Sequence, residues 1–467
     1  MKTRLHTLSI ILILTLAAGL LSTPHGNISA AAGLPVSSDS CITYVNAAAL
    51  GANNGLSWTN AFKNLQDGIN ASAAGCQVWV AQGKYSPSGS SRLNSFYLKN
   101  GVAIYGGFVG NESGLLQRDW YDNETILSGD IGHLNDNSDN AENVIFVDTN
   151  INSTAVLDGL TITGGNANGS QVNGGGVYAH NGSPTLTNLT IQNNNASENG
   201  GGVYISGGNP ALSDVYIQNN TANNGAGLYI TNVYNTALAL VLIQDNSAGT
   251  DGGGLFSDST GTGLTLIDMI VQGNHAGHSG GGAYFSASAP VLTNVKFADN
   301  GSTAFGGGIS DYKSSPTLTN VTLFGNTSPA GGGIYDFETS DPVVRNSILW
   351  GDTVGEIYND PGFSDSVTTI TYSLVQGCKP AGGTWNTATC GTDGGNNVTD
   401  SDPKFYDPDN YDLHLQAGSP AINRGNNAFV NGVTTDLEGV ARIFGRVVDL
   451  GAYEYPFEFV FLPIIKK

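Results

Sequence analysis

A glycine triplet recurs through the middle of this chain at a nearly constant interval of 25 to 28 residues. Each triplet is followed by an aliphatic residue and, in most cases, by an aromatic one. The triplets begin at Gly174, Gly200, Gly225, Gly252, Gly280, Gly306 and Gly331. A fixed period of this length indicates an array of structural repeats in which each unit packs on its neighbours.

A second marker keeps the same period, because an asparagine follows three residues after an aliphatic or aromatic residue in each unit. These residues are Asn194, Asn220, Asn246, Asn274, Asn300 and Asn326. One unit, 200–224, holds two short β-rich runs, Val203–Ile205 and Val215–Ile217, between turn-forming residues and shows no helical spacing. The content fits one coil of an all-β, single-stranded parallel β-helix, and leucine-rich, ankyrin and tetratricopeptide repeats do not match it.

Both markers have a physical reason within such a coil. Glycine reaches positive φ and lets backbone pass where a Cβ would clash, so the triplets predict a corner that every coil repeats. Asparagine tolerates the left-handed conformation, and identical side chains stacked coil on coil can form a ladder of amide hydrogen bonds. A structural role for these residues is therefore favoured over phosphate or dinucleotide binding.

The second residue after each triplet forms a column that faces outward, because the aliphatic residue before it points into the coil. The column contains Tyr178, Tyr204, Tyr229, Phe256, Tyr284 and Tyr335, with Ser310 at the place between the last two. Exposed aromatic rows can bind sugar rings, and we take these six as candidate ligand-binding residues. The alternative, which we favour over ligand binding, is that the rings stack on each other and stabilise the sheet.

Composition places the chain outside the cytoplasm and away from nucleic acid. The formal net charge is −21, which disfavours binding to a polyanion. Residues 1–32 have the features of a secretory signal: Lys2 and Arg4, the apolar run Leu8–Leu21, and small residues at Ala30–Ala32. That run is too short to favour a membrane span, and no later segment supplies one.

The chain has four cysteines, an even number, and their spacing is not that of a zinc finger. Such cysteines are expected to form disulfides in an exported protein. Cys378 and Cys390 flank a Gly/Thr-rich loop and are the preferred bridge. Cys41 and Cys76 can staple the amino-terminal part if the two approach each other, but the sequence does not fix the pairing.

We divide the mature chain into four parts. Residues 33–163 hold an N-terminal capping helix, expected between Asn60 and Ser72, and irregular opening coils; 164–352 are the regular coils. Residues 353–455 hold closing coils and a small C-terminal cap, and 456–467 form a tail. Caps are expected because a terminal coil otherwise exposes apolar core and unpaired strand edges.

Three sets of residues carry a resemblance to known families. They are Tyr44–Asn46, Gly55–Trp58, Phe62–Gln66 and Val78–Tyr85; then Gly331–Tyr335 with Phe297 and Asn300; then Gly418–Asn423, Asp436, Gly439, Arg442 and Val448–Glu454. The first set resembles secreted bacterial right-handed β-helix proteins of the pectate-lyase-like superfamily. The second is similar to repeats of polymorphic outer-membrane-type proteins, and the third resembles the carboxy-terminal region of choice-of-anchor Q surface proteins. Together they imply a right-handed β-helix that is exported or attached to a bacterial surface.

Because the pectate-lyase-like superfamily contains polysaccharide lyases and hydrolases, we searched the repeats for catalytic groups. From Asp158 to Asp352 the only basic residues are Lys296, Lys313 and Arg345, at different phases of the coil, which disfavours a lyase. A hydrolase needs two carboxylates on neighbouring coils, and Asp311 and Asp336 stand at the same phase. If side chains alternated strictly along each strand, both aspartates would point into the coil. We nevertheless expect the strands to end before them, so that they are solvated turn residues rather than a catalytic pair or a Ca²⁺ site.

No metal site has a specific motif. Asp136–Asp139 and Asp393–Asp402 are acidic and could bind calcium, but they lack the spacing of known calcium loops. We therefore expect no cofactor, with Ca²⁺ as the one ion to test. The sequence favours a secreted or cell-surface, adhesin-like monomer that binds a glycan or another surface component without catalysis. The alternatives are a polysaccharide hydrolase or lyase and a structural spacer.

Overall fold

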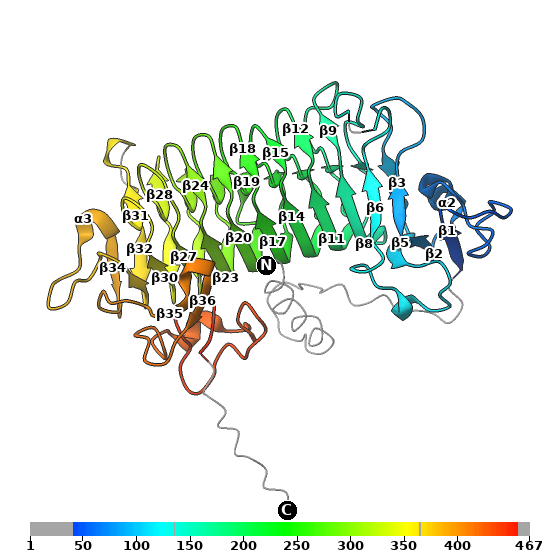
Figure 1. Cartoon of the computed structure of the whole chain (residues 1–467). Helices are drawn as coiled ribbons and strands as arrows, with labels where there is room; N and C mark the ends of the chain where they lie inside the picture. The colour runs from blue at the N-terminus through cyan, green and yellow to red at the C-terminus, as the bar shows by residue number, and fades with distance from the viewer. Residues whose placement is uncertain (1–40, 135, 364–365, 456–467) are drawn as a thin grey trace, which may run out of the picture.

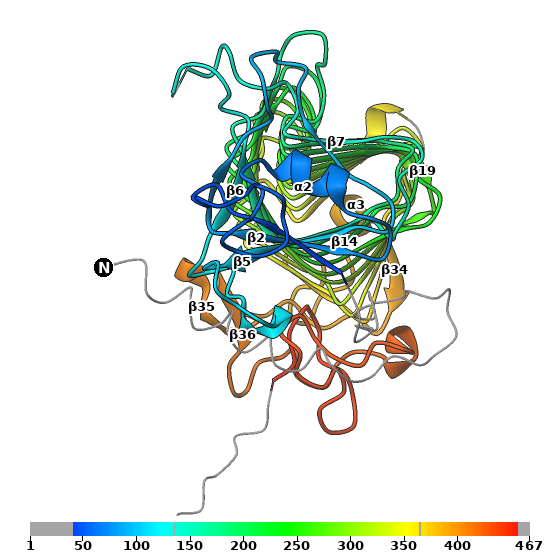
Figure 2. The same ribbon diagram turned by 90° about the vertical axis from the view of Figure 1, so that its right-hand side faces the viewer.

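The computed structural model describes residues 41–134, 136–363 and 366–455. The predicted signal (1–32) and tail (456–467) lie outside these residues. The described chain is a right-handed parallel β-solenoid of about 12 turns with few helices, which confirms the predicted fold class (Figure 1). Viewed along the axis, the coils superpose into one closed outline (Figure 2).

The coils pair through three parallel sheets, here named A, B and C; the central coils contribute one strand to each, whereas the coils from Thr317 to Val375 contribute two short strands to sheet A and none to sheet C. Sheet A contains β1 (Ile42–Val45), β2 (Gln77–Ala81), β3 (Gly83–Tyr85), β5 (Ala103–Phe108), β6 (Thr125–Ser128), β8 (Val156–Thr163), β11 (Thr185–Gln192), β14 (Ala211–Gln218), β17 (Thr236–Gln244), β20 (Leu264–Gln272), β23 (Val291–Ala298), β26 (Thr317–Thr319), β27 (Thr322–Phe324), β29 (Val343–Arg345), β30 (Ile348–Trp350), β32 (Thr369–Thr371), β33 (Leu374–Val375) and β34 (Thr392–Gly395). Sheet B contains β4 (Phe96–Tyr97), β7 (Ile145–Val147), β10 (Val177–His180), β13 (Val203–Ser206), β16 (Leu228–Thr231), β19 (Leu255–Gly261), β22 (Ala283–Ser288), β25 (Ile309–Tyr312), β28 (Ile334–Phe337) and β31 (Ile357–Asn359). Sheet C contains β9 (Asn166–Ala167), β12 (Asn195–Ala196), β15 (Thr221–Ala222), β18 (Ser247–Ala248), β21 (His275–Ala276) and β24 (Gly301–Ser302).

The glycine triplets form the corner before the seven sheet B strands from β10 to β28, as predicted, but only the first glycine of each has positive φ. Gly200, for example, has φ +64°, whereas Gly201 is not among the residues with positive φ. A Cβ on Gly201 would lie 2.2 Å from the carbonyl oxygen of Thr221 on the next coil. The triplet therefore combines one left-handed residue with two close approaches of backbone.

The predicted asparagine ladder is also present, fully buried inside the corner between sheets A and C. The side-chain oxygen of Asn246 accepts from the backbone N–H and the Nδ2 of Asn220, each at 3.0 Å, and its own Nδ2 donates to Asn274 and to Ile217 O. Asn326 ends the ladder by donating to Asp352, which occupies the next asparagine place. The repeat thus satisfies its buried polar groups coil by coil.

Both ends of the solenoid are covered and held by a disulfide. At the start, α2 (Leu65–Ala71) buries Leu65 and Ile69 in the core, and Cys41 bonds to Cys76. The helix is shorter than predicted because Phe62 instead pairs with the backbone of Tyr44, after which Asn64 caps the helix. At the far end Cys378 bonds to Cys390 beside Trp385, which packs on the core next to α3 (Thr387–Cys390). Both disulfide pairs that we considered are therefore formed.

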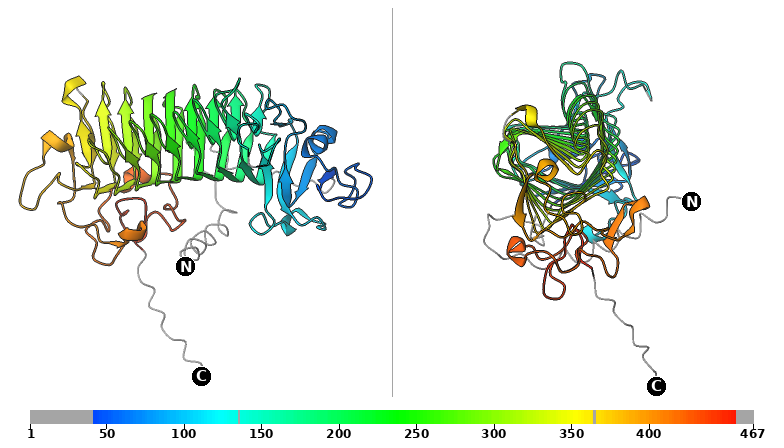
Figure 3. Two further views of the ribbon diagram at one scale, coloured as in Figure 1. Left: turned by 45° about the horizontal axis from the view of Figure 1, so that its top comes forward. Right: turned by 90° about the vertical axis from the view of Figure 1, so that its left-hand side faces the viewer.

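Residues 403–455, here named the lateral segment, lie along the outer side of sheet A and not over the open end (Figures 1 and 3). The segment holds the antiparallel pair β35 (Phe405–Asp407) and β36 (Asp412–Leu415) and the short 3-10 turns η3 (Pro408–Asn410) and η4 (Asn427–Val430). Two further turns, η1 (Leu115–Gln117) and η2 (Pro361–Phe363), lie in loops. The small C-terminal cap that we predicted is thus the 378–390 loop. The lateral segment lies beside sheet A and does not cover the end of the coils.

The lateral segment is attached through a second apolar cluster and a buried ion pair. Phe405, Leu413 and Leu450 pack against outward side chains of β27 and β30. Arg442 is fully buried; its Nη2 lies 2.7 Å from Glu454 Oε1, and its Nη1 donates to Asn294 at 3.3 Å. The residues that resemble the choice-of-anchor Q region thus form the attachment of this segment to the coils.

Candidate functional site

The aromatic column lies on the outer side of sheet B, in register from strand to strand. Tyr178 pairs with Tyr204, Tyr204 with Tyr229, and so on along the sheet. Ring centroids of successive members from Tyr178 to Tyr284 are 4.8 to 5.5 Å apart, and most pairs are stacked. The predicted column is therefore a continuous stack, in which each ring covers the face of the next.

The stacking decides which part of each ring a ligand can touch. Tyr178, Tyr204, Tyr229, Phe256 and Tyr284 are half-buried, with edges rather than faces toward solvent. Tyr335 does not belong to this surface: it is 3% exposed and stacks on Phe305 at 4.6 Å. Ser310 interrupts the column as expected, and Tyr312 and Phe337 form a separate pair two residues further along their strands.

Two members of the stack were missed by the sequence pattern. Tyr97 and Phe146 extend it toward the N-terminus. Tyr358, also missed, stacks on Tyr335 at 5.4 Å and lies beyond the interruption at Ser310. The sequence pattern did not include these residues because no glycine triplet precedes them. The run Ile145–Val147 nevertheless has the same aliphatic–aromatic–aliphatic order as the strands that follow a triplet, and this order could have identified Phe146.

Burial raises the pKa of Tyr178, and burial with the nearby Asp258 raises that of Tyr229 further. These two hydroxyls therefore stay protonated at neutral pH and offer neutral donors and acceptors beside aromatic edges. Neighbouring outward positions on these strands are mostly uncharged, such as Ser206, Thr231 and Ser286, so the face suits a neutral, hydroxyl-rich ligand.

Asp311 and Asp336 are in register on β25 and β28 but are fully buried inside the solenoid. Our expectation of solvated turn residues was wrong, because the strands continue to Tyr312 and Phe337 and keep both side chains on the inward phase. A polysaccharide outside the coils cannot reach them. As a hydrolytic pair they are excluded by position, although the two carboxyl groups interact.

The surroundings of this pair leave several oxygens without partners. Asp311 pairs with Phe285 on the preceding strand, and Asp336 with Asn359 on the following one. The hydroxyl of Thr368 donates to Asp336, whereas both carboxyl oxygens of Asp311 and one of Asp336 have no hydrogen-bond donor. Burial, and the neighbouring Asp336, raise the pKa of Asp311 well above its ordinary value, and burial also raises the pKa of Asp336.

The three Lys and Arg residues of the repeats lie apart from one another, and each contacts another residue. Lys296 is buried beneath the lateral segment and donates to Tyr411 O. Lys313 lies over the ring of Tyr312, and Arg345 lies over Phe429. These three side chains therefore lie apart and do not form a basic cluster.

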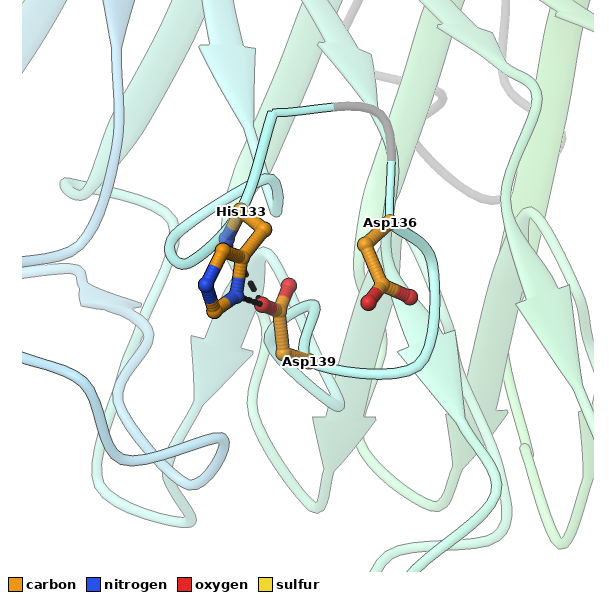
Figure 4. Close-up of side chains that lie close together, drawn as sticks. All are labelled: His133, Asp136 and Asp139. Carbon is orange, nitrogen blue, oxygen red and sulfur yellow. Dashed lines mark hydrogen bonds and ion pairs between the residues drawn. The ribbon is translucent and has the colours of Figure 1, made fainter.

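One exposed loop brings three residues of metal-binding types together: one histidine and two aspartates. In Figure 4, Asp136 and His133 face Asp139 across the loop, and one ligand atom from each lies within 4.8 Å of the others. His133 Nδ1 is 3.1 Å from Asp139, and Asp136 accepts from Ser138, which lowers its pKa. His133 and Asp136 are exposed, and the hydrogen bonds within the loop explain how the three side chains are arranged without a metal ion.

Two open clefts lie near the C-terminal coils. One of about 550 Å³ is lined by polar residues that include Tyr372, Asn397 and Arg424, and one of about 330 Å³ is bordered by Asn359, Asp360 and Ser366. Within the described residues, no helix is long and apolar enough to cross a membrane.

Comparisons with known proteins find a similar solved structure but no similar sequence. No family model matches the chain, and no curated protein matches it. Among solved structures, that of pectate lyase Pel9A is similar with a TM-score of 0.48 and 15% sequence identity, covering 89% of this chain and 96% of that one. The resemblance to choice-of-anchor Q proteins remains a prediction.

Proposed function

We propose that this chain is a secreted or cell-surface, adhesin-like β-solenoid that binds a glycan through the outer side of sheet B without catalysis. The observation that carries the proposal is the aromatic stack from Tyr97 to Tyr284, with the tyrosine hydroxyls along it. Because the ring faces are occupied by their neighbours, the ligand contacts ring edges and hydroxyls. Two intact disulfides support an extracellular location.

The test is glycan-array binding by the mature protein and two double variants. Replacing Tyr204 and Tyr229 by Phe removes two hydroxyls and keeps the stack, so we expect binding to weaken about 30-fold, since each net hydrogen bond contributes roughly 1 kcal/mol. Replacing both by Ala removes the edges too and should weaken binding further. Tyr234→Ala is the matched control, because Tyr234 is 83% exposed on a loop away from the stack.

The outcomes separate the three functions that the sequence left open. Wild-type binding that the control retains and the double variants lose supports a glycan-binding protein. Release of reducing or unsaturated sugars by the wild type would replace it with an enzyme, and absence of any glycan ligand would favour a spacer. Amino-terminal sequencing of exported protein should begin near Gly33, and a retained Leu8–Leu21 segment would contradict secretion.

A further inference from the structure

The aromatic stack repeats at the distance that separates the coils, and this period limits what can lie along it. Seven rings from Tyr97 to Tyr284 follow one another, with centroids 4.8 to 5.7 Å apart from each ring to the next. Because strands of neighbouring coils lie about 4.8 Å apart, the stack extends roughly 30 Å along the axis. The coils superpose when viewed along the axis, so the stack is nearly straight (Figure 2).

One flank of the stack is open because a glycine stands beside the base of the rings. A Cβ on Gly225 would lie 3.0 Å from Tyr229 Cβ and 2.9 Å from Phe256 Cβ. A Cβ on Gly280 would likewise lie 2.9 Å from Tyr284 Cβ. The first residue of each triplet therefore adds no side chain beside the rings, and a ligand can approach the ring edges from this flank.

The charges around the stack exclude an anionic ligand. The chain has no Lys or Arg between Arg118 and Lys296, the stretch that contains every ring except Tyr97. On the outer side of sheet B, Asp258 lies two residues beyond Phe256. A polyanion would find no counter-charge here and would be repelled by Asp258, so the ligand is neutral.

The period also separates one kind of neutral polymer from another. An extended polypeptide repeats every two residues, or about 6.7 Å, so its side chains lose register with the coils after a few steps. In an extended β-1,4-linked pyranose chain, each sugar advances by little more than the length of its own ring, which is close to one coil. Such a chain can therefore make the same contact with each successive coil.

We infer that the aromatic stack binds a linear, neutral, β-1,4-linked glycan whose chain lies parallel to the solenoid axis, with about one sugar on each coil. The inference rests on the proposed function and adds the class, direction and length of the ligand. The tyrosine hydroxyls, with Ser206 and Ser286 on the second flank, bind the sugar hydroxyls. Phe256 is a gap in this row of hydroxyls, and a chain of about seven sugars covers the whole stack.

The first test is calorimetric titration of the mature protein with cello-, xylo- and manno-oligosaccharides of two to about eight sugars. For a series that binds, we expect the affinity to rise about fivefold with each added sugar, the value of one net hydrogen bond, and to level off near about seven sugars. A glycan that crosses the stack at right angles contacts only one or two coils. Its affinity would stop rising at about three sugars, and that result would overturn the inference.

The second test adds the hydroxyl that the row lacks. Phe256→Tyr should strengthen binding of the hexasaccharide about fivefold, whereas the disaccharide, which already has a place beside Tyr204 and Tyr229, should gain at most about twofold. Phe337→Tyr is the matched control, because it makes the same change on β28, beyond the interruption at Ser310, and should leave both affinities unchanged. Equal hexasaccharide affinities of Phe256→Tyr and the wild type would count against a chain along the axis.

The inference and the proposed function fail in different ways. Binding only of anionic, branched or 1,3-linked glycans, or of a single sugar as tightly as of a hexasaccharide, overturns the inference and leaves glycan binding in place. Absence of binding to every glycan of the array contradicts both. Binding that is unchanged when Tyr204 and Tyr229 are both replaced by Ala places the glycan outside the stack and also contradicts both.

Discussion

At the residue scale, the corner of each coil depends on two different properties of glycine. Gly200 occupies the left-handed region with φ +64°, where side chains are strained. Gly201 has no such requirement, but a Cβ there would meet Thr221 O at 2.2 Å. Ala226, at the equivalent place one coil later, shows that a single methyl group is accommodated at one corner. The tolerance of a corner is therefore set by the distance to the next coil.

We expect Gly201→Val to destabilise the fold by roughly 3 kcal/mol or more, because its side chain has no room between coils. Gly261→Val is the matched control, since Gly261 has φ +54° but nothing within 4 Å of its Cβ position, so it reports backbone strain alone. Denaturant unfolding of both variants provides the comparison. Equal losses would show that the close approach in the corner is unimportant.

The stability of the fold depends on pH through Asp352. Burial raises the pKa of this side chain to about 6 from an ordinary value of 3.8. Because the folded-state pKa is the higher one, this group stabilises the fold most below pH 4, and its contribution is lost as pH rises through about 6. Asp352→Asn should reduce the fall in Tm between pH 4 and pH 7 and extend the amide ladder by one member. A wild-type Tm that is constant over this range would contradict the shift.

At the scale of elements, ladders hold the strands of one coil to the next. The buried amide ladder stabilises the corner between sheets A and C, and the aromatic stack covers the outer side of sheet B. Each works only in a parallel sheet in register, where identical residues are neighbours. An interruption, such as Ser310 in the aromatic stack, leaves the register intact because the backbone pairing continues.

We predict that Asn246→Ala lowers the free energy of unfolding by on the order of 3 kcal/mol, because it removes the acceptor of Asn220 and a donor to Ile217 O in the interior. Asn209→Ala, at an exposed loop position, should change it by less than about 0.5 kcal/mol. Chemical unfolding of both variants measures the difference. Similar stabilities would mean that water replaces the lost amide.

At the scale of the whole molecule, the lateral segment is joined to the coils by a polar centre within an apolar interface. Arg442 and Glu454 are both buried, and Lys296 donates to Tyr411 O beside them in the same interface. Burial alone lowers the pKa of His414, but Glu438 and Asp412 outweigh it and raise the pKa to about 9. His414 is therefore cationic at neutral pH and joins Asp412 and Glu438 within the lateral segment.

Arg442→Ala should release the lateral segment, because it leaves Glu454 buried without its partner, a loss of about 3 to 5 kcal/mol. Limited proteolysis should then cut within 403–455 while the circular dichroism of the solenoid is retained. Arg446→Ala, an exposed arginine four residues away, is the control and should remain resistant. A resistant Arg442→Ala would show that the apolar contacts alone hold the segment.

The sequence by itself determined the solenoid, its period, the amide ladder and the outward aromatic column. These features repeat at every coil, so local residue type and register are enough to define them. The predicted runs Val203–Ile205 and Val215–Ile217 lie within the observed strands Val203–Ser206 and Ala211–Gln218, since alternation and flanking turn formers mark them clearly. The capping helix was predicted too long because Phe62 pairs with a strand distant in sequence.

The tertiary structure alone decided the features that depend on contacts across coils. The ring faces in the aromatic stack are covered because neighbouring strands bring them to about 5 Å, and Tyr335 is buried because Phe305 packs over it. Asp311 and Asp336 are interior because their strands continue one residue beyond them. The lateral segment lies along sheet A because Arg442 finds Asn294, 148 residues away, and no local pattern encodes a partner at that distance.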